Sequence, residues 1–455
     1  MRRIIVASAV VLGSLVVPRE VLAAGLTVAR FGAEHGHPMT TEPTAVYYNP
    51  SGIADSEGGH VFGDVTLAFR RASYEHARAS TDATDPTGAE GANTGRATLS
   101  NVIAEPFVGA TYRIQRFALG AAFYTPFGGQ NSWDENGAYR GNATAPGAVD
   151  GVQRWYAISG VLRSSYFTLA TAYSFGPVSV GVSANLIQTV ADTVQARNSN
   201  GGDDVRTEGR AWLDAHSWDP SLGLGVTVTP LRDKSTLRLG LSYQSQPNLG
   251  GGIVTKGTLH TSFAGRRADS DVRFTTDLPD VLRAGVAYRP REDVEVRLFG
   301  DYQRWSVLDH QCIYLASSRC NLNPDGSAQP GSAVILNFVR NWHDTFGVRA
   351  GGSYWMDPRL ELLAGVGYTS KAVPDSTLEP ALLDFDAVSA SAGAVFAYLG
   401  PVRIATTYTH VFYLPRDTTG RSLHPTFAAP SNSPDSSGKY TLALDLLNVN
   451  ADVRF

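Results

Sequence analysis

Few residues in this chain have the types and spacing that chemistry requires. Glu34, His35 and His37 lie close together and resemble metal ligands, but two histidines fall short of the three or four ligands that a zinc site needs. We therefore expect solvated histidines and no metal site. His410 and Ser422 could pair as a base and a nucleophile, although no pattern singles them out. The nucleophile-elbow, metalloprotease and P-loop patterns are absent from the sequence, which predicts a protein that is not an enzyme and uses no cofactor.

Five hairpin patterns, each with a tyrosine just ahead of a tight polar turn, recur along the chain. Each consists of short alternating apolar runs closed by Gly, Pro, Asp or charged residues, which is typical of a β-hairpin. The tyrosines are Tyr112, Tyr173, Tyr288, Tyr354 and Tyr398. Tyrosine rings settle at the edge of a bilayer, with the hydroxyl among the headgroups. The repeat therefore predicts a membrane β-barrel whose tight turns and tyrosines mark its periplasmic rim.

The connections between the apolar runs alternate between tight and long. Tight turns are expected near Ile114–Gln115, Gly176–Pro177, Arg232–Asp233, Arg289–Asp293, Asp357–Pro358 and Gly400–Pro401. Long polar loops are expected over residues 77–100, 128–153, 192–208, 257–268, 308–337, 371–385 and 414–438. This alternation is typical of outer-membrane barrels. It predicts an all-β fold with fourteen antiparallel strands in one transmembrane barrel, in preference to two soluble sandwiches with unusually long loops.

The first residues of the chain have the pattern of a secretory signal. Arg2 and Arg3 precede an apolar run over residues 4–17, and Ala23 ends a group of small residues. We expect a signal peptide over residues 1–23. The apolar run is too short to span a bilayer, which takes about 20 residues.

The last residues alternate strictly. One face carries Leu447, Val449, Ala451, Val453 and Phe455, and the other carries Asn448, Asn450, Asp452 and Arg454. A final aromatic residue resembles the signal of outer-membrane barrels, so the barrel assembly machinery is an expected partner through Phe455. An edge strand of a secreted sandwich is the alternative. The net charge of −4 argues against a nucleic-acid partner.

Cys312 and Cys320 are the only cysteines, and both fall in one expected loop. In a chain destined for an oxidising compartment, a disulfide between them is the default expectation. It would restrain the loop and have no catalytic role.

Residues 24–59 do not have the pattern of strands. Pro38, Pro43 and Pro50 interrupt any ladder, while aromatic residues such as Phe31 and Tyr47 argue against a disordered tail. We expect this segment to fold back into the lumen as a plug, with residues 60–455 forming the barrel.

Within that segment, the stretch TAVYYNPSG from Thr44 to Gly52 resembles the plug of the FadL/TodX family of outer-membrane transporters for long-chain fatty acids and other hydrophobic compounds. Further resemblances follow in the family's order at Tyr124–Gly128, Leu278–Asp280, Trp305–Ser306, Asn341–Thr345 and Pro374–Asp375. The resemblance covers essentially the whole mature chain. Two departures are the loosely matching stretch Leu382–Asp386 and the loop with two cysteines.

The resemblance implies a fourteen-stranded barrel closed by an N-terminal plug, with sideways exit at a kink in the third strand. The plug motif then falls on Asn49, Pro50, Ser51 and Gly52. The third-strand lateral opening falls on Tyr124, Thr125, Pro126, Phe127 and Gly128. We also expect Asn49 to satisfy backbone groups that the kink leaves unpaired.

The predicted function is passive, plug-gated uptake of long-chain fatty acids or similar hydrophobic molecules, by a monomer in contact with outer-membrane lipid and lipopolysaccharide. Uptake of aromatic hydrocarbons is one alternative, and a general porin or a structural and adhesive barrel is another. Several cations could pair with a substrate carboxylate, and the sequence does not choose among them. They are Lys256, Arg266, Arg267, Arg283 and Arg340.

Overall fold

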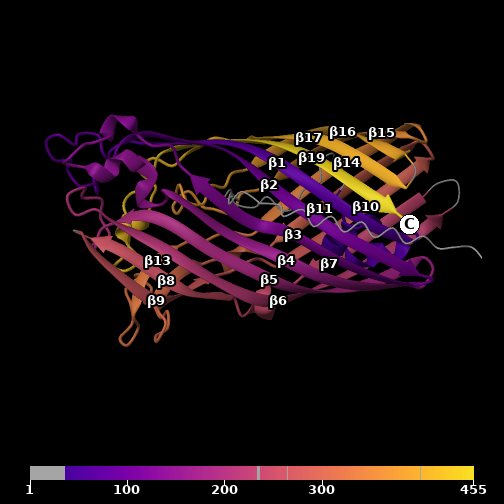
Figure 1. Cartoon of the computed structure of the whole chain (residues 1–455), viewed down its shortest axis with the longest axis horizontal. Coiled ribbons are helices and arrows are strands. Elements are labelled where there is room, and N and C mark those ends of the chain that lie inside the picture. The colour runs from indigo at the N-terminus through magenta and orange to yellow at the C-terminus, as the bar shows by residue number, and fades with distance from the viewer. Residues whose placement is uncertain (1–35, 233–235, 264, 400) are drawn as a thin grey trace, which may run out of the picture.

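The computed structural model describes residues 36–232, 236–263, 265–399 and 401–455. This part of the chain forms one closed antiparallel β-barrel (Figure 1). Around the barrel the strands follow one another in sequence order, and β1 pairs with β19 from His60↔Arg454 to Glu75↔Lys439 to close the wall. The fourteen wall strands are β1 (Gly59–His76), β2 (Gly95–Ile114), β3 (Phe117–Ser132), β4 (Ser159–Ser174), β5 (Val178–Arg197), β6 (Gly209–Arg232), β7 (Thr236–Gln244), β10 (Val281–Arg291), β11 (Val294–Gln303), β14 (Thr345–Asp357), β15 (Leu360–Thr369), β16 (Ala387–Leu399), β17 (Val402–Tyr413) and β19 (Lys439–Arg454). The predicted fold class and strand number are confirmed.

Tight turns lie at one end of the barrel and long connections at the other, and we name these the turn end and the loop end. The turn end includes the connection from Ile114 to Phe117, and the loop end includes the connection from His76 to Gly95. The described C-terminal residue lies at the turn end (Figure 1). Four of the five repeated tyrosines are exposed near the turn end, at 39–50% of their surface: Tyr112, Tyr173, Tyr288 and Tyr354. The side chain of Tyr398 is outside the described set.

A second set of strands extends the sheet at the loop end. β8 (Ile253–Phe263) pairs with the part of β6 nearer the loop end. The strands β9 (Arg266–Thr276), β12 (His310–Leu315) and β13 (Val334–Val339) then follow, each paired with the one before it. β18 (Arg416–Asp417) adds a short pair to β19. The prediction of a long loop over residues 257–268 is therefore wrong, because a β-hairpin occupies this region. β7 ends at Gln244 and leaves the upper half of β6 without a partner on that side, so β8 takes the place of β7 there.

The wall alternates between the two faces as a strand must. On β6, Leu222, Leu224 and Val226 face outward and are exposed, whereas Gly223 and Gly225 face the lumen. An apolar outer face suits a membrane because lipid cannot satisfy polar groups.

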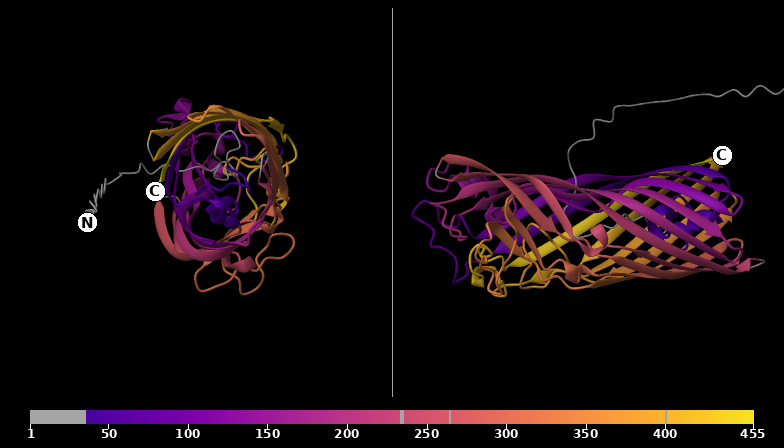
Figure 2. Two further views of the ribbon diagram at one scale, coloured as in Figure 1. Left: turned by 90° about the vertical axis from the view of Figure 1, so that its right-hand side faces the viewer. Right: turned by 90° about the horizontal axis from the view of Figure 1, so that it is seen from below.

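Helical turns are short and lie in the lumen or in the connections. The lumen contains α1 (Ala45–Tyr48) and η1 (Pro50–Asp55), seen as the indigo coil inside the ring in Figure 2. The connections contain η2 (Gly137–Tyr139), η3 (Pro146–Asp150), η4 (Val152–Trp155), η5 (Pro247–Gly250), η6 (Trp305–Val307) and η7 (His424–Thr426). No helix in the described ranges is long and apolar enough to cross a membrane.

Candidate functional site

Residues 36–56, which we call the luminal segment, lie inside the barrel at the turn end. Ala45 and Ile53 have no exposed surface, and Val46 is 1% exposed. Glu42 pairs with Arg403 of β17, and the carbonyl of Met39 accepts a hydrogen bond from Arg238 of β7 at 3.2 Å. Because these contacts reach separate parts of the wall, the segment crosses the lumen.

Asn49 anchors the luminal segment to β6. Its side-chain nitrogen donates to the carbonyl of Pro38 at 2.8 Å and to the carbonyl of Val226 at 3.1 Å. Its side-chain oxygen accepts from the backbone nitrogen of Ser51 at 3.2 Å, which caps η1 with Pro50 in the first helical turn. The hydroxyls of Ser51 and Thr227 lie 2.6 Å apart. Asn49 itself has no exposed surface.

Glycines let the luminal segment approach the wall closely. A Cβ on Gly225 would come within 1.9 Å of the Asn49 side-chain oxygen, and one on Gly181 within 2.4 Å of Pro50. Inside the segment, a Cβ on Gly52 would come within 2.1 Å of the carbonyl of Thr40. The four motif residues therefore form a compact turn that fits a smooth patch of β5 and β6.

The expectation that Asn49 serves a kink in the third strand is wrong. Its hydrogen bonds run to β6 and to Pro38, because capping η1 turns its side chain toward that wall. The contact with β3 is instead made by Val46, which meets Gly120, and by Tyr47, whose ring lies 4.8 Å from that of Tyr124.

Tyr47 also holds a cation. The guanidinium of Arg283 lies 4.5 Å from the centre of the Tyr47 ring and 5.8 Å from that of Tyr48. Such cation–π contacts stabilise by about 0.5–2 kcal/mol when removed from water. Arg283 faces the lumen, as its alternation with Leu282 and Ala284 predicts.

The barrel wall is broken between β2 and β3. These strands pair only from Ile114↔Phe117 to Val108↔Phe123, whereas β2 continues to pair with β1 up to Gly95. The two sides meet again where the backbone nitrogen of Asp134 donates to the carbonyl of Thr98 at 2.9 Å. We call the stretch between these two closures the window.

A β-bulge lies at the edge of the window that is nearer the turn end. On β3, Thr125 and Pro126 stand opposite the single residue Ser165 of β4, between the pairs Tyr124↔Tyr166 and Phe127↔Ser164. A bulge bends its strand and disrupts the ladder locally, and proline has no N–H to offer. The five residues from Tyr124 to Gly128 therefore lie where β3 leaves β2.

Aromatic rings fill the window in this structure. Phe107 of β2 stacks on Tyr124 of β3 with centroids 5.4 Å apart, and Tyr124 stacks on Tyr166 at 5.7 Å. Above them, Arg70 of β1 donates across the window to the carbonyl of Gln130 at 2.9 Å.

Two adjoining cavities lie on the lumen side of the upper part of β3. The first, the aromatic cavity, has a volume of about 60 Å³ and is walled by Phe127, Leu278, Trp305, Leu308 and Trp342. The two tryptophan rings lie 5.1 Å apart, and Phe127 meets Trp305 edge-on at 5.8 Å. The cavities share the lining residues Gly129, Leu162, Gln311 and Leu382.

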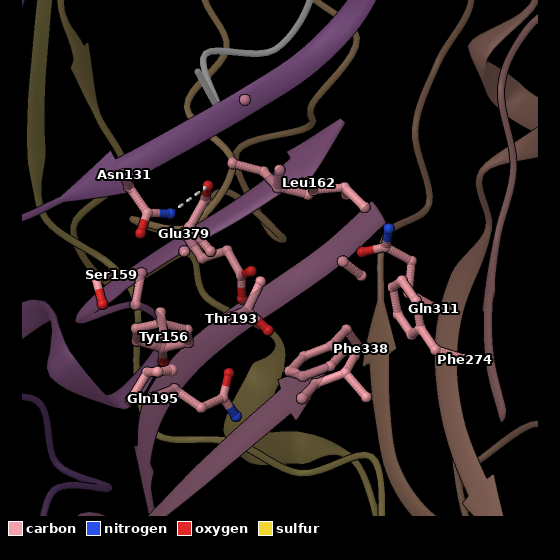
Figure 3. Close-up of a pocket in the computed structure, with 18 of the residues that line it drawn as sticks. Asn131, Tyr156, Ser159, Leu162, Thr193, Gln195, Phe274, Gln311, Phe338 and Glu379 are labelled. Atoms are coloured by element: carbon pink, nitrogen blue, oxygen red, sulfur yellow. Dashed lines mark hydrogen bonds between the residues drawn. The ribbon is translucent and has the colours of Figure 1, made fainter. Parts of the chain in front are cut away.

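The second cavity, about 70 Å³, lies beside the first (Figure 3). Leu162, Phe274 and Phe338 give it an apolar side, and Asn131 crosses it to bond the carbonyl of Ala381 at 3.4 Å. Its only charged lining residues are Arg340 and Glu379. Sequence reasoning missed most of this lining, because inward positions of a strand look alike wherever they lie along the lumen.

Arg340 is neutralised where it borders the cavity. It pairs with Glu379 at 2.6 Å and donates to the Gln311 side-chain oxygen at 2.8 Å. His424 lies 3.9 Å from the same carboxylate, and burial lowers the pKa of His424, with Glu379 opposing the shift. Of the five cations that the sequence offered for a carboxylate, Arg340 lines the second cavity and the other four line neither cavity.

The remaining sequence candidates do not line the cavities. Cys312 and Cys320 are joined by a disulfide with an S–S distance of 2.03 Å. Glu34 and His35 lie outside the described residues, and among those described no three His, Cys, Asp or Glu side chains form a group that could hold a metal. The structure does not bring His410 and Ser422 together, because His410 bonds Asp445 at 2.6 Å and Ser422 lies 3.2 Å from Ser436.

The sequence profile of the outer membrane protein transport family, OMPP1/FadL/TodX, matches residues 14–418. The chain belongs to this family. It is 23% identical over 428 residues to a putative outer membrane protein of Neisseria meningitidis serogroup B, covering 87% of this chain and 85% of that protein. The resemblance predicted from the plug motif is thus confirmed, and the protein is an outer-membrane transporter of hydrophobic compounds. Members of the FadL/TodX family are channels, so the expectation that it is not an enzyme is confirmed as well.

Solved structures share the fold at low identity. A FadL homologue of Pseudomonas aeruginosa superposes with a TM-score of 0.74 at 15% identity, covering 96% of this chain and all of that one. The toluene transporter TodX of P. putida gives 0.67 at 13% identity, with 95% and 99% covered. The toluene transporter TbuX of Ralstonia pickettii gives 0.64 at 14% identity, with 95% and 99% covered.

Proposed function

We propose that this FadL/TodX-family protein takes up an uncharged, compact hydrophobic molecule, such as an aromatic hydrocarbon, and releases it sideways through the window. One observation carries the proposal: Phe127 and Gly128 line the aromatic cavity and also belong to the part of β3 that has left β2. A molecule held against Trp305 and Trp342 therefore lies next to the break in the wall.

The charges around the cavities favour an uncharged substrate over a fatty acid. The aromatic cavity has one charged lining residue, the carboxylate Asp277, and the second cavity has the Arg340–Glu379 pair. A substrate carboxylate would face two acids and an arginine that is already paired, and burying an unpaired charge is expensive. The cavity volumes also favour a compact ligand over a long chain: one benzene ring takes a cavity of about 150 Å³, so the two adjoining cavities, of about 60 and 70 Å³, come near to the space for a single ring only when taken together. Two proteins of the same fold are toluene transporters, which supports this choice.

In this proposal the luminal segment is the plug. It closes the lumen at the turn end, so the window is the route left for a hydrophobic molecule. The turn end is periplasmic and the loop end extracellular, as the tyrosine rim and short turns favour. Aromatic rings line the route from Trp342 through Phe127 to Tyr124, and release into lipid requires no aqueous step.

The substrate is tested by binding. Toluene titrated into the purified protein should quench tryptophan fluorescence, and Trp342→Ala should weaken its affinity about tenfold or more, because a buried aromatic contact and its packing are lost. Trp212→Ala is the matched control, since Trp212 is 42% exposed at the outer face. Palmitate should bind more weakly than toluene. Equal affinity of wild type and Trp342→Ala for toluene would contradict the proposed site.

The route is tested by removing the bulge. Deleting Pro126 leaves Thr125 alone opposite Ser165 and keeps Phe127 on the lumen side, so β3 is expected to continue its pairing with β2. Uptake of radiolabelled toluene by cells should then fall to the level of cells without the protein, while toluene binding by the purified variant persists. Undiminished uptake by the deletion variant would refute exit through the window.

A further inference from the structure

Three cationic side chains and one histidine lie in one row on the outer face of the barrel. His216 of β6 is the direct partner of Lys256 of β8, and Lys256 is the partner of Arg273 of β9. Toward β4 the same row continues through Val190 to Arg163. His216 and Lys256 are exposed, and Arg163 and Arg273 are half-buried. We call these four residues the cationic row.

The cationic row begins where the apolar outer surface ends. Outward positions of β6 are apolar from Val228 to Trp218, and His216 is the next outward residue. That stretch matches the ~9–11 residues that a tilted strand needs to cross the hydrocarbon. Trp218 is 49% exposed and lies 5.6 Å from Phe167 of β4, which places an aromatic pair at this level. Aromatic residues mark membrane interfaces in such barrels, so the cations stand at the headgroup level of the loop end.

Within the described residues, no acidic side chain forms an ion pair with the cationic row. Over the described ranges, Lys256, Arg273 and His216 form no ion pair or hydrogen bond through their side chains, and the Arg163 Nε is buried without a partner. Acidic residues occupy the next row outward. In the strand register, Asp192 stands opposite Asp214, and Thr258 stands opposite both Asp214 and Asp271. Moving outward from the membrane, the surface is therefore apolar, then aromatic, then cationic, then acidic.

We propose that the cationic row binds the phosphate groups of an outer-leaflet lipid. Neighbouring strands lie about 4.8 Å apart, so Lys256 and Arg273 are close enough to contact one phosphate together, and an arginine fork suits phosphate geometry. The acyl chains would pack on the apolar belt of β6 below Trp218. The acidic row repels phosphate from positions further out and so fixes the depth of the headgroup. The charge order favours a phosphorylated lipid over a protein partner, because the cations adjoin the hydrocarbon belt directly.

The proposal does not depend on the transported substrate. It is tested by native mass spectrometry of the purified protein in detergent, with added lipid A carrying two phosphates. The double variant Lys256→Gln/Arg273→Gln should lose about 30-fold in affinity, since each basic residue at an anionic surface contributes about fivefold. Lys256→Gln alone should lose about fivefold. Arg71→Gln is the control, because Arg71 is an outward cation elsewhere on the wall that pairs with Asp445 at 3.5 Å.

Several outcomes would overturn the proposal. One is unchanged lipid A binding by a double variant that keeps the heat-modifiable mobility of a folded barrel. Another is an equal loss in Arg71→Gln, which would indicate general surface charge. A third is competition by inorganic phosphate at the concentration of the lipid, because a free anion site would not need the apolar belt. Weaker retention of monophosphorylated lipid A than of the diphosphorylated form by wild type would support it.

Discussion

Replacing Asn49 by alanine should loosen the luminal segment while leaving the barrel intact. The substitution removes the donor to Pro38 and to Val226, at 2.8 and 3.1 Å, and the acceptor for the backbone nitrogen and hydroxyl of Ser51, at 3.2 and 2.6 Å. Alanine restores none of these contacts.

The size of the effect follows from the number of bonds. Each hydrogen bond contributes about 1 kcal/mol net, so the loss of three or four weakens the seating of the segment by about 3–4 kcal/mol. At 1.4 kcal/mol for each factor of ten, the ratio of unseated to seated molecules should rise about 10²–10³-fold. Gly225→Ala should act in the same direction from the wall side, because its Cβ would come within 1.9 Å of the Asn49 oxygen.

Hydrogen exchange measures this directly. Amides of residues 45–55 in Asn49→Ala should exchange faster than in wild type by the factor above, and single-channel recordings should show more frequent openings. Asn185→Ala is the matched control: Asn185 is equally an inward, buried asparagine, and its bonds to Thr168 and Ser221, at 2.6 and 3.0 Å, stay within the wall. Unchanged exchange over residues 45–55 in Asn49→Ala would refute the anchoring role, as would equal acceleration in Asn185→Ala.

The remaining predictions concern the charges at the cavity wall. Glu379→Gln frees Arg340 from its 2.6 Å pair, so benzoate affinity, measured by tryptophan quenching, should rise about tenfold or more while toluene affinity is unchanged; Glu57→Gln, at an exposed residue of the turn end, should change neither. Burial lowers the pKa of His424 below 6.5, so its contribution to stability is present above pH 6.5 and is lost as the pH falls through that value, when the unfolded chain takes up the proton first. Asp384 in the neighbouring loop titrates with the opposite sign, because burial raises its pKa to about 6. Proteolysis of the loops from pH 7.5 to 5 should therefore accelerate more in wild type than in His424→Gln, and identical pH profiles would contradict the role of His424.

The sequence was sufficient to predict the barrel because the patterns that indicate each strand and each connection lie within short segments of the chain. Alternation along each run and a tight or long connection after it can be read within about twenty residues, and both were correct for the wall strands. The hairpin of β8 and β9 escaped the prediction because its many polar residues have the composition of a long loop. Only the short length of β7, which ends at Gln244 while β6 continues beyond it, decides that this hairpin lies beyond the membrane.

The site was less predictable because its contacts are distant in sequence. The motif at Asn49 was recognised, but its partner Val226 lies 177 residues away, and nothing near Asn49 indicates β6 rather than β3. Gly225 is the residue of β6 that permits the close approach of Asn49, yet a glycine at an inward strand position can be present for many other structural reasons. The cavity residues Phe274 and Phe338 are likewise ordinary inward aromatics until the extension of the sheet brings them beside Leu162.

The three parts of the site are joined by one continuous run of aromatic contacts. Trp342 lies 5.1 Å from Trp305, Trp305 lies 5.8 Å from Phe127, Phe127 lies 6.2 Å from Tyr166, and Tyr166 lies 5.7 Å from Tyr124. Tyr124 in turn lies 4.8 Å from Tyr47 of the luminal segment. Packed interiors have little free volume, so a ligand that displaces Phe127 must move Tyr124 or Tyr166. Under the proposed function, opening the window would therefore disturb the contact between Tyr124 and Tyr47, and a bound substrate would be coupled both to the window and to the luminal segment.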